Sequence, residues 1–393
     1  MAVVVLMSYQ SFTFSFPTRI VFGPGESGRA AEYAAQMNPK KVFVCTYADV
    51  RLPVLDALLQ GLDARGIPHY LHAACTANPR AEQIDAAAAI FLREGCDLIV
   101  GVGGGSVIDT CKGVALLAKN PCEQGVWAYV SAEKQAENGA WPIGLVVTIA
   151  STGSESNESF VVTDKLNEQK MICNHPSVRP AFSICDPTLT LTLPRRQTAL
   201  GAADIFSHVL EQYLHRDPAV DVSDNMSLGI LEAVYAWGPV ACETPENLNA
   251  RSNLMWASIL AMSRVLGVGH EENWLCHMLE HAVSAKYNIP HGAGMTAILP
   301  AYLRFIAPQD DTGKLDALKK LFGSEDAASG LAAFFRRMGL PVSLTEALGF
   351  TPDDGIIREL AEHALPWGDM AAGGYAPFTL EDAVRVLREA RNG

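Results

Sequence analysis

An aspartate and a histidine with helical spacing form the first candidate site. Asp204 and His208 lie four residues apart, so both side chains project from one face of a predicted helix. Their neighbours Ile205, Phe206 and Val209 are apolar, which indicates that this helix is largely buried. A buried carboxylate and a buried imidazole need hydrogen-bond partners or a metal ion.

Three further histidines follow in the same half of the chain. His277 and His281 repeat the four-residue spacing on a second predicted helix, and His291 follows Pro290 in a loop after that helix. A lone histidine is more often a hydrogen-bonded core residue than a ligand, but four of the 10 histidines belong to this set. Imidazoles gathered with a carboxylate are typical ligands of a divalent metal, and we therefore predict a metal site.

A glycine turn in the first half indicates a phosphate-binding site. Gly103, Gly104, Gly105 and Ser106 stand where a predicted strand gives way to a helix, whose N-terminal N–H groups can receive a pyrophosphate. The pattern is not the GxGxxG fingerprint, so a plain tight turn is the alternative.

Polar residues follow that turn on the new helix and in a later loop. We include Asp109 among the candidate catalytic residues, although Asp109 and Lys112 together could equally form an exposed polar helix face. Ser154 and Asn157 are candidates for polar substrate contacts or for structural roles.

The elements that must position these residues fall into two groups. Residues before Asp186-Pro187 alternate between strands and helices, which predicts a doubly wound α/β domain. The strands are expected at 12–22, 41–46 and 97–102, and the helices at 54–62, 81–94 and 107–118.

The second group is helical. Long helices are expected at 197–214, 221–237, 248–266 and 274–286, with shorter ones between 339 and 392. We therefore predict an α/β dinucleotide-binding domain over residues 1–187 and an all-helical metal and catalytic domain over residues 188–393. The short connection predicts a cleft between them in which ligands bind.

Composition excludes several classes of function. The chain has 393 residues, of which 49% are hydrophobic, and a net charge of −13, which disfavours nucleic acid as a partner. No apolar stretch approaches the roughly 20 residues of a membrane span, and the start of the chain, Met1–Met7, lacks the basic region of a signal peptide. The nine cysteines show no CxxC spacing, so we expect reduced thiols and a cytoplasmic location.

The motifs together resemble the group III, iron-containing alcohol dehydrogenases over nearly the whole chain. They are Phe22–Gly25, Asn78-Pro79, Gly103–Lys112, Thr152–Asn157, Asp186–Thr190, Gly201–His208 and the segment from His277 to His291. The sequences of residues 154–157 and 276–281 are most similar to those of the butanol dehydrogenase and broad aldehyde reductase branch.

The resemblance implies a fold, a set of ligands and a cofactor. It implies an N-terminal nucleotide-binding α/β domain and a C-terminal helical domain, as in the dehydroquinate synthase-like architecture. One divalent metal would be bound by Asp204, His208, His277 and His291, and His281 would be an additional histidine near the cofactor. Cofactor contacts would fall on Asn78, Gly104, Gly105, Ser106, Thr148, Ser151, Lys170 and Leu189. A homodimer or larger homo-oligomer is expected.

The implied reaction is hydride transfer between NAD(P)(H) and a small alcohol or aldehyde. The metal would polarise the substrate oxygen as a Lewis acid, and His281 would relay a proton or position the nicotinamide. Three imidazoles with a carboxylate favour Fe²⁺, which accepts five or six ligands, and Zn²⁺ is the alternative.

The sequence leaves the choice of nicotinamide open. Asp49 follows the first nucleotide-binding strand and could bind the ribose 2′-OH of NAD, whereas Arg51 could accept the 2′-phosphate of NADP. The resemblance to the aldehyde reductase branch tilts the expectation toward NADP.

Three other functions are compatible with parts of the pattern. A sister enzyme, such as a glycerol dehydrogenase or a dehydroquinate synthase, shares the architecture, but the four-ligand set and the 152–157 motif argue against it. A metallohydrolase would have no use for the glycine turn. A catalytically idle binding protein is disfavoured because the ligand set and the glycine turn are both intact.

Overall fold

The computed structural model describes residues 10–217, 220–365, 375 and 378–393. The chain divides into two compact units. An α/β unit comprises Phe16–Pro194 together with Thr244–Met262, and a helical unit comprises the described residues among 10–15, Arg195–Glu243 and Ser263–Gly393. The predicted boundary at residue 187 stays a prediction. The segment Met1–Met7 lies outside the described residues.

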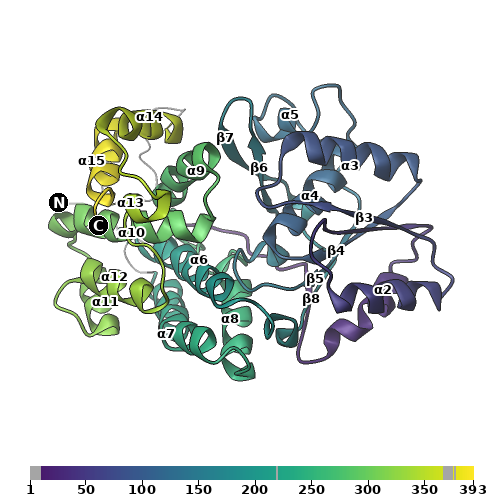
Figure 1. Ribbon diagram of the computed structural model, residues 1–393, viewed down its shortest axis with the longest axis horizontal. Coiled ribbons are helices and arrows are strands. Elements are labelled where there is room, and N and C mark those ends of the chain that lie inside the picture. The colour runs from purple at the N-terminus through teal and green to yellow at the C-terminus, as the bar shows by residue number, and fades with distance from the viewer. Residues whose placement is uncertain (1–9, 218–219, 366–374, 376–377) are drawn as a thin grey trace, which may run out of the picture. The chain divides into compact units, whose positions relative to one another are not determined.

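The α/β unit is built on a six-stranded sheet in the order β1-β8-β5-β4-β2-β3, and every neighbouring pair is parallel (Figure 1). The strands are β1 (Arg19–Phe22), β2 (Val42–Tyr47), β3 (His69–Cys75), β4 (Leu98–Gly103), β5 (Ile143–Val147) and β8 (Phe182–Cys185). The chain moves outward from β2 to β3 and in the opposite direction from β4 to β5. The order therefore reverses between β2 and β4, which is where ligands of open α/β sheets commonly bind.

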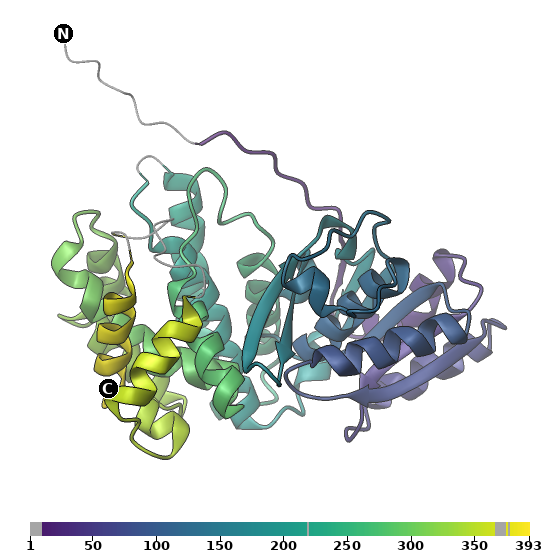
Figure 2. The ribbon, with the colours of Figure 1, turned by 90° about the horizontal axis from the view of Figure 1, so that it is seen from above.

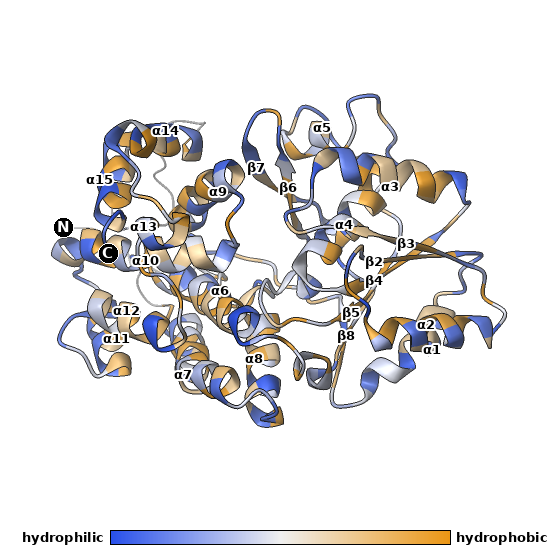
Figure 3. Ribbon diagram, viewed as in Figure 1, coloured by the Kyte–Doolittle hydropathy of each residue, from blue (hydrophilic) through white to orange (hydrophobic). Residues whose placement is uncertain are grey.

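Helices cover both faces of this sheet because its central strands are apolar on both sides. In β2, Val42 and Val44 pack in one hydrophobic cluster, with α1 (Ala30–Gln36) and α2 (Pro53–Asp63). Phe43 and Cys45 pack in the other, with α3 (Ala81–Arg93) and α4 (Gly105–Lys119). This alternation is the period of two expected for a strand, and the apolar strands stand out in Figure 3.

Smaller elements complete the α/β unit. A two-stranded antiparallel sheet joins β6 (Ser159–Asp164) to β7 (Gln169–Asn174). The remaining elements are α5 (Trp127–Val130), α8 (Leu248–Ala261) and the short 3-10 helices η1 (Glu26–Arg29), η2 (Ser154–Ser156), η3 (Pro176–Val178) and η4 (Pro187–Thr190).

Two helices at the centre of the helical unit are buried along most of their length. These are α6 (Arg195–Tyr213) and α10 (His291–Ile306), and Phe206 of α6 packs against the rings of Phe322, Phe334 and Phe335. The other helices are α7 (Asp221–Glu243), α9 (Leu275–Tyr287), α11 (Lys314–Phe322), α12 (Ala327–Arg337), α13 (Leu344–Leu348), α14 (Asp354–Ala364), α15 (Leu380–Ala390) and the 3-10 helix η5 (Ala307–Gln309). The parallel sheet and the helical unit confirm the predicted fold class. Among the described residues, no helix combines the length and the apolar character that a membrane crossing requires.

Three predicted elements are wrong in extent. The helix expected at 221–237 continues through Pro239 to Glu243. The strand expected at 12–22 begins only at Arg19, and residues 10–18 form an extended segment outside any helix or strand (Figure 2). Its alternating phenylalanines produced the error, because they are exposed (Phe12 by 53% and Phe14 by 43%) instead of packed on a sheet. The helix expected at 248–266 ends at Ala261, before the backbone turns at Arg264 with a φ of +71°.

Candidate functional site

The predicted metal site lies in the helical unit, and α6 provides its first two residues. Asp204 and His208 are one turn apart and both are buried. The distance from His208 Nε2 to Asp204 Oδ1 is 3.7 Å. The two side chains therefore share one face of the helix, as their spacing predicts.

Two other helices bring the remaining histidines to this face. His277 lies in the first turns of α9, and its ring lies 4.7 Å from that of His208, measured between centroids. His291 is the first residue of α10 and not a loop residue, and its Nε2 lies 3.5 Å from Asp204 Oδ1. One possible ligand atom from each of the four residues lies within 4.8 Å of the others. The chain thus gathers the predicted donors from three helices.

Two buried glutamates, absent from the sequence predictions, orient the imidazoles. Glu211 accepts a hydrogen bond from Nδ1 of His277 and a second from the N–H of Cys276, at 2.7 Å. Glu280 accepts a hydrogen bond from Nδ1 of His291. Both carboxylates have no exposed side-chain surface. A carboxylate that accepts the Nδ1 hydrogen leaves Nε2 available to bind a metal. Metal-binding histidines in proteins usually have such a hydrogen-bond partner at the other ring nitrogen.

The Nε2 atom of His277 supports this reading. It is buried and has no hydrogen-bond partner among the described residues. Buried polar atoms in folded proteins are almost always satisfied, so an unsatisfied imidazole nitrogen in this cluster fits a metal ligand.

Space and charge also fit a metal ion. A Cβ atom at Gly294 would lie 2.6 Å from Cγ of Glu280, so glycine leaves room for this carboxylate. Burial lowers the pKa of His208 to about 4, which keeps its imidazole neutral and able to coordinate. Burial also lowers the pKa of His277, but the Glu211 carboxylate raises it by more, so the net shift is upward. Three imidazoles with one carboxylate suit Fe²⁺ or Zn²⁺.

Two aromatic side chains border the four-residue cluster. The ring of His281, one turn beyond His277 on α9, lies 5.6 Å from that of His291 and 6.5 Å from that of His277. The ring of Trp274 lies 5.2 Å from that of His277, and its Nε1 donates a hydrogen bond to Glu272. His281 therefore lies outside the group of four predicted ligands, although it forms a second group of possible ligand side chains with Glu280 and His291.

The glycine turn lies in the α/β unit, at the point where the strand order reverses. Gly104 donates its N–H to the Tyr47 hydroxyl at 2.9 Å, which joins the ends of β4 and β2. A Cβ atom at Gly105 would lie 2.6 Å from Cγ2 of Thr152, so a larger residue would displace the loop that follows β5. Gly105 and Ser106 form the first turn of α4, slightly earlier than predicted.

The other predicted cofactor residues belong to the same unit. Those that follow the carboxyl ends of parallel strands are Asp49 after β2, Asn78 after β3, Gly104, Gly105 and Ser106 around the end of β4, Thr148 and Ser151 after β5, and Leu189 after β8. Lys170 lies on β7, opposite Thr163 of β6, whose N–H donates to the carbonyl of Pro79. Parallel strands place their carboxyl ends at one edge of a sheet, so the structure groups most of these positions along one edge.

Asp109 and Lys112 are buried, which corrects the alternative of an exposed polar helix face. Nζ of Lys112 lies 2.6–3.1 Å from five oxygen atoms of Ser154, Asn157 and Ser159. The Asp109 carboxylate accepts hydrogen bonds from the Ser154 hydroxyl, at 2.9 Å, and from the N–H of Val161, at 3.2 Å. Burial raises the pKa of Asp109 to about 6 and lowers the pKa of Lys112 to about 8. Ser154 and Asn157 thus have structural partners.

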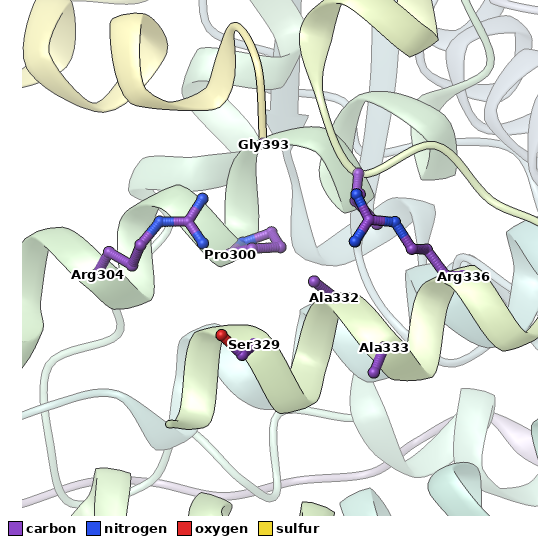
Figure 4. Close-up of a pocket in the computed structure, with 8 residues that line it drawn as sticks. Pro300, Arg304, Ser329, Ala332, Ala333, Arg336 and Gly393 are labelled. Atoms are coloured by element: carbon purple, nitrogen blue, oxygen red, sulfur yellow. The ribbon is translucent and has the colours of Figure 1, made fainter. Parts of the chain in front are cut away.

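A cavity elsewhere in the helical unit does not coincide with the cluster. It has a volume of about 430 Å³ and lies beside α10 and α12, where Arg304 and Arg336 flank it (Figure 4). None of the predicted site residues lines it. The grouping of donor side chains, and not the size of a cavity, therefore locates the candidate site.

A parallel sheet with a glycine turn at its edge and a helical unit that gathers imidazoles with a carboxylate define a nucleotide- and metal-dependent class of enzyme. A family profile described as iron-containing alcohol dehydrogenase matches residues 17–187. A second, described as the C-terminal part of the Fe-containing alcohol dehydrogenase family, matches residues 198–391. The chain belongs to the iron-containing alcohol dehydrogenase family.

Individual relatives agree with this assignment. The chain is 29% identical to the NADH-dependent butanol dehydrogenase A of Clostridium acetobutylicum, with 97% of this chain and 99% of the relative covered. It is 30% identical to the NADPH-dependent aldehyde reductase YqhD of Escherichia coli, with 97% and 100% covered. The crystal structure of a butanol dehydrogenase A from Thermotoga maritima superposes with a TM-score of 0.90 at 28% identity, covering 98% of this chain and 99% of that one. These findings confirm the predicted branch and the enzyme class, a metal-dependent alcohol dehydrogenase or aldehyde reductase.

The Glu211 carboxylate should control metal affinity. In Glu211→Gln the neutral amide offers one acceptor oxygen to two donors, so we expect the affinity for Fe²⁺ or Zn²⁺ to fall by roughly 10- to 100-fold. Competition with a chelator measures this affinity. Glu389→Gln, which removes an exposed carboxylate paired with Arg304, is the matched control and should bind metal normally. Equal affinities in both variants would contradict the role of Glu211.

Proposed function

We propose that this enzyme transfers hydride between a nicotinamide dinucleotide and a small alcohol or aldehyde, at a metal held by Asp204, His208, His277 and His291. The observation that carries the proposal is the convergence of these four donors, two of which have buried carboxylates at Nδ1. The names of the relatives, an NADH-dependent butanol dehydrogenase and an NADPH-dependent aldehyde reductase, support the nicotinamide and the substrate class.

The residues of the cluster would hold one divalent ion, for which we favour Fe²⁺ and keep Zn²⁺ as the alternative. Such an ion supplies Lewis-acid polarisation of a substrate oxygen. The chain itself contributes three imidazoles, and Glu211 and Glu280 fix the orientation of two of them, those of His277 and His291. Trp274, whose ring lies 6.1 Å from that of His208, offers an apolar surface beside the site for a short alkyl chain.

The nucleotide would bind along the carboxyl edge of the sheet. The N-terminus of α4 and its glycine turn offer N–H groups to the pyrophosphate, and Gly104, Gly105 and Ser106 let the phosphates approach closely. Asn78, Thr148, Ser151, Lys170 and Leu189 would contact the rest of the cofactor.

We expect NADPH to be used better than NADH. The side chain of Arg51 is 86% exposed beside the end of β2, and it can turn from Asp56, 3.1 Å away, toward a 2′-phosphate. Asp49, also exposed, is the residue that would favour NADH.

We propose a homodimer or a larger homo-oligomer in the cytoplasm. The exposed side chains of Phe12, Phe14 and Phe16 lie on an extended segment, which supports contact with a second copy. All nine cysteines are free thiols, which supports a reducing compartment. Light scattering coupled to gel filtration measures the mass, and a monomer at micromolar concentration would contradict the assembly.

The reaction is tested by following oxidation of NADPH and NADH with butanal in protein loaded anaerobically with Fe²⁺. We expect butanal-dependent oxidation, faster with NADPH, and its loss in Asp204→Ala together with loss of bound metal. No oxidation of either cofactor by metal-loaded protein would refute the proposed substrate class and favour a sister enzyme of narrower specificity. Aldehyde-independent hydrolysis of an ester would favour a metallohydrolase.

His281 is proposed to relay a proton or to position the nicotinamide, because it adjoins the ligand cluster. His281→Ala should lower kcat by about 100-fold, in the range of general acid–base catalysis, and should flatten the pH profile of kcat. Metal content should not change. His363→Ala alters an exposed histidine of α14 and serves as the control. Loss of metal from His281→Ala would instead make His281 a ligand.

Asp109, the second candidate catalytic residue, acts in this proposal through Ser154 and the loop after β5, because its carboxylate accepts hydrogen bonds from the Ser154 hydroxyl and the N–H of Val161. Replacing it with Asn should weaken cofactor binding more than it lowers kcat, and the kcat-against-KM comparison measures this.

A further inference from the structure

A helix from the C-terminal half of the sequence forms part of the α/β unit. The segment Thr244–Met262, which contains α8, belongs to the α/β unit although the residues before and after it belong to the helical unit. One of its contacts in the α/β unit is the loop that follows β5, which includes the proposed cofactor residue Ser151. The helix also contacts η4, and the ring of Trp256 lies 5.6 Å from that of Phe22 in β1. We infer that Ser258 of α8 is a positioning residue for the dinucleotide, acting through this loop.

The Ser258 hydroxyl makes the contacts of a backbone anchor. It accepts hydrogen bonds from the N–H groups of Ser151 and Gly153, each at 3.2 Å. It can donate its own hydrogen to the carbonyl oxygen of Ser151, 3.2 Å away, or to Oε1 of Glu155, 3.5 Å away. A hydroxyl has one donor and two acceptor sites, so this loop takes up all the hydrogen-bonding capacity of the Ser258 hydroxyl.

The loop is shaped to reach α8. Gly153 has a φ of +61°, and a Cβ atom there would lie 2.5 Å from the Ser258 carbonyl oxygen, so only glycine permits this approach. The hydroxyl of Ser156 adds a hydrogen bond to the carbonyl of Ile259, at 3.1 Å. The contact with α8 therefore involves both backbone and side chains along the loop.

The far end of the loop is fixed independently by Lys112 of α4, through its contacts with Ser154, Asn157 and Ser159. At the near end, residues 151–153, the Ser258 hydroxyl accepts the N–H groups of Ser151 and Gly153. That end also packs on the glycine turn, since Cγ2 of Thr152 lies 2.6 Å from where a Cβ of Gly105 would be. Movement of residues 151–153 would thus alter the surface proposed to receive the cofactor. The inference rests on the proposed nicotinamide site.

The test compares dinucleotide affinity in metal-loaded wild type and Ser258→Ala. Alanine leaves two N–H groups without their acceptor, and we expect the loop to sample other conformations. The Kd of NADPH, measured by fluorescence titration, and its KM should both rise by about tenfold. Metal content should stay equal to that of wild type.

Two variants separate positioning from general stability. Ser258→Thr keeps the hydroxyl and should restore the affinity. Ser252→Ala changes a half-buried serine of the same helix and should bind like wild type. If Ser258→Ala does not fold, Ser258→Cys, a weaker acceptor of similar size, is measured in its place with the same expectation.

Two outcomes would overturn the inference in different ways. A lower melting temperature with unchanged Kd and KM would make Ser258 a purely structural residue while leaving the proposed function intact. Failure of wild type itself to bind NADPH or NADH would remove the proposed cofactor, and the role of Ser258 with it.

Discussion

The pairing of a buried carboxylate with the Nδ1 atom of an imidazole organises the helical unit. Glu211 and Glu280 have no exposed surface, and a buried charge without compensation is strongly unfavourable. Each is compensated by a histidine from another helix or another part of the chain. Because Glu211 also accepts the N–H of Cys276, the first turn of α9 is held against α6 at one rotational setting. The ligand geometry follows from this need to neutralise charge.

The donors themselves could be predicted from the sequence because their spacing reflects helix geometry. The four-residue spacing places Asp204 and His208 on one face of a helix, and it does the same for His277 and His281. A carboxylate grouped with imidazoles indicated metal chemistry. The partners of His277 and His291 could not be predicted in the same way. Glu211 is 66 residues from His277, and only the packing of α6 on α9 selects it among the acidic residues. Its position three residues after His208 was the available signal.

The fold was predictable where hydrophobic pattern and turn chemistry agreed. The apolar runs of β2 and β4, together with the glycine turn, were sufficient to predict a doubly wound α/β unit. The edge strand β3 was missed because its residues, among them His69 and His72, are half exposed and do not alternate clearly. Lys112 illustrates a different limit. A lysine on a helix usually indicates a solvent-exposed helix face. Lys112 is buried because its ammonium group contacts oxygen atoms of residues more than 40 positions away in the sequence.

The assignment of α8 to the α/β unit bears on the modularity of this chain. Phe16–Pro194 alone would carry the complete parallel sheet but would lack the hydroxyl that accepts the N–H groups of Ser151 and Gly153. Neither compact unit corresponds to one uninterrupted stretch of the gene. Recombination that exchanged the first half of such a gene for that of another dehydrogenase would pair each new loop with a foreign α8. The loop after β5 and α8 are therefore expected to be inherited together.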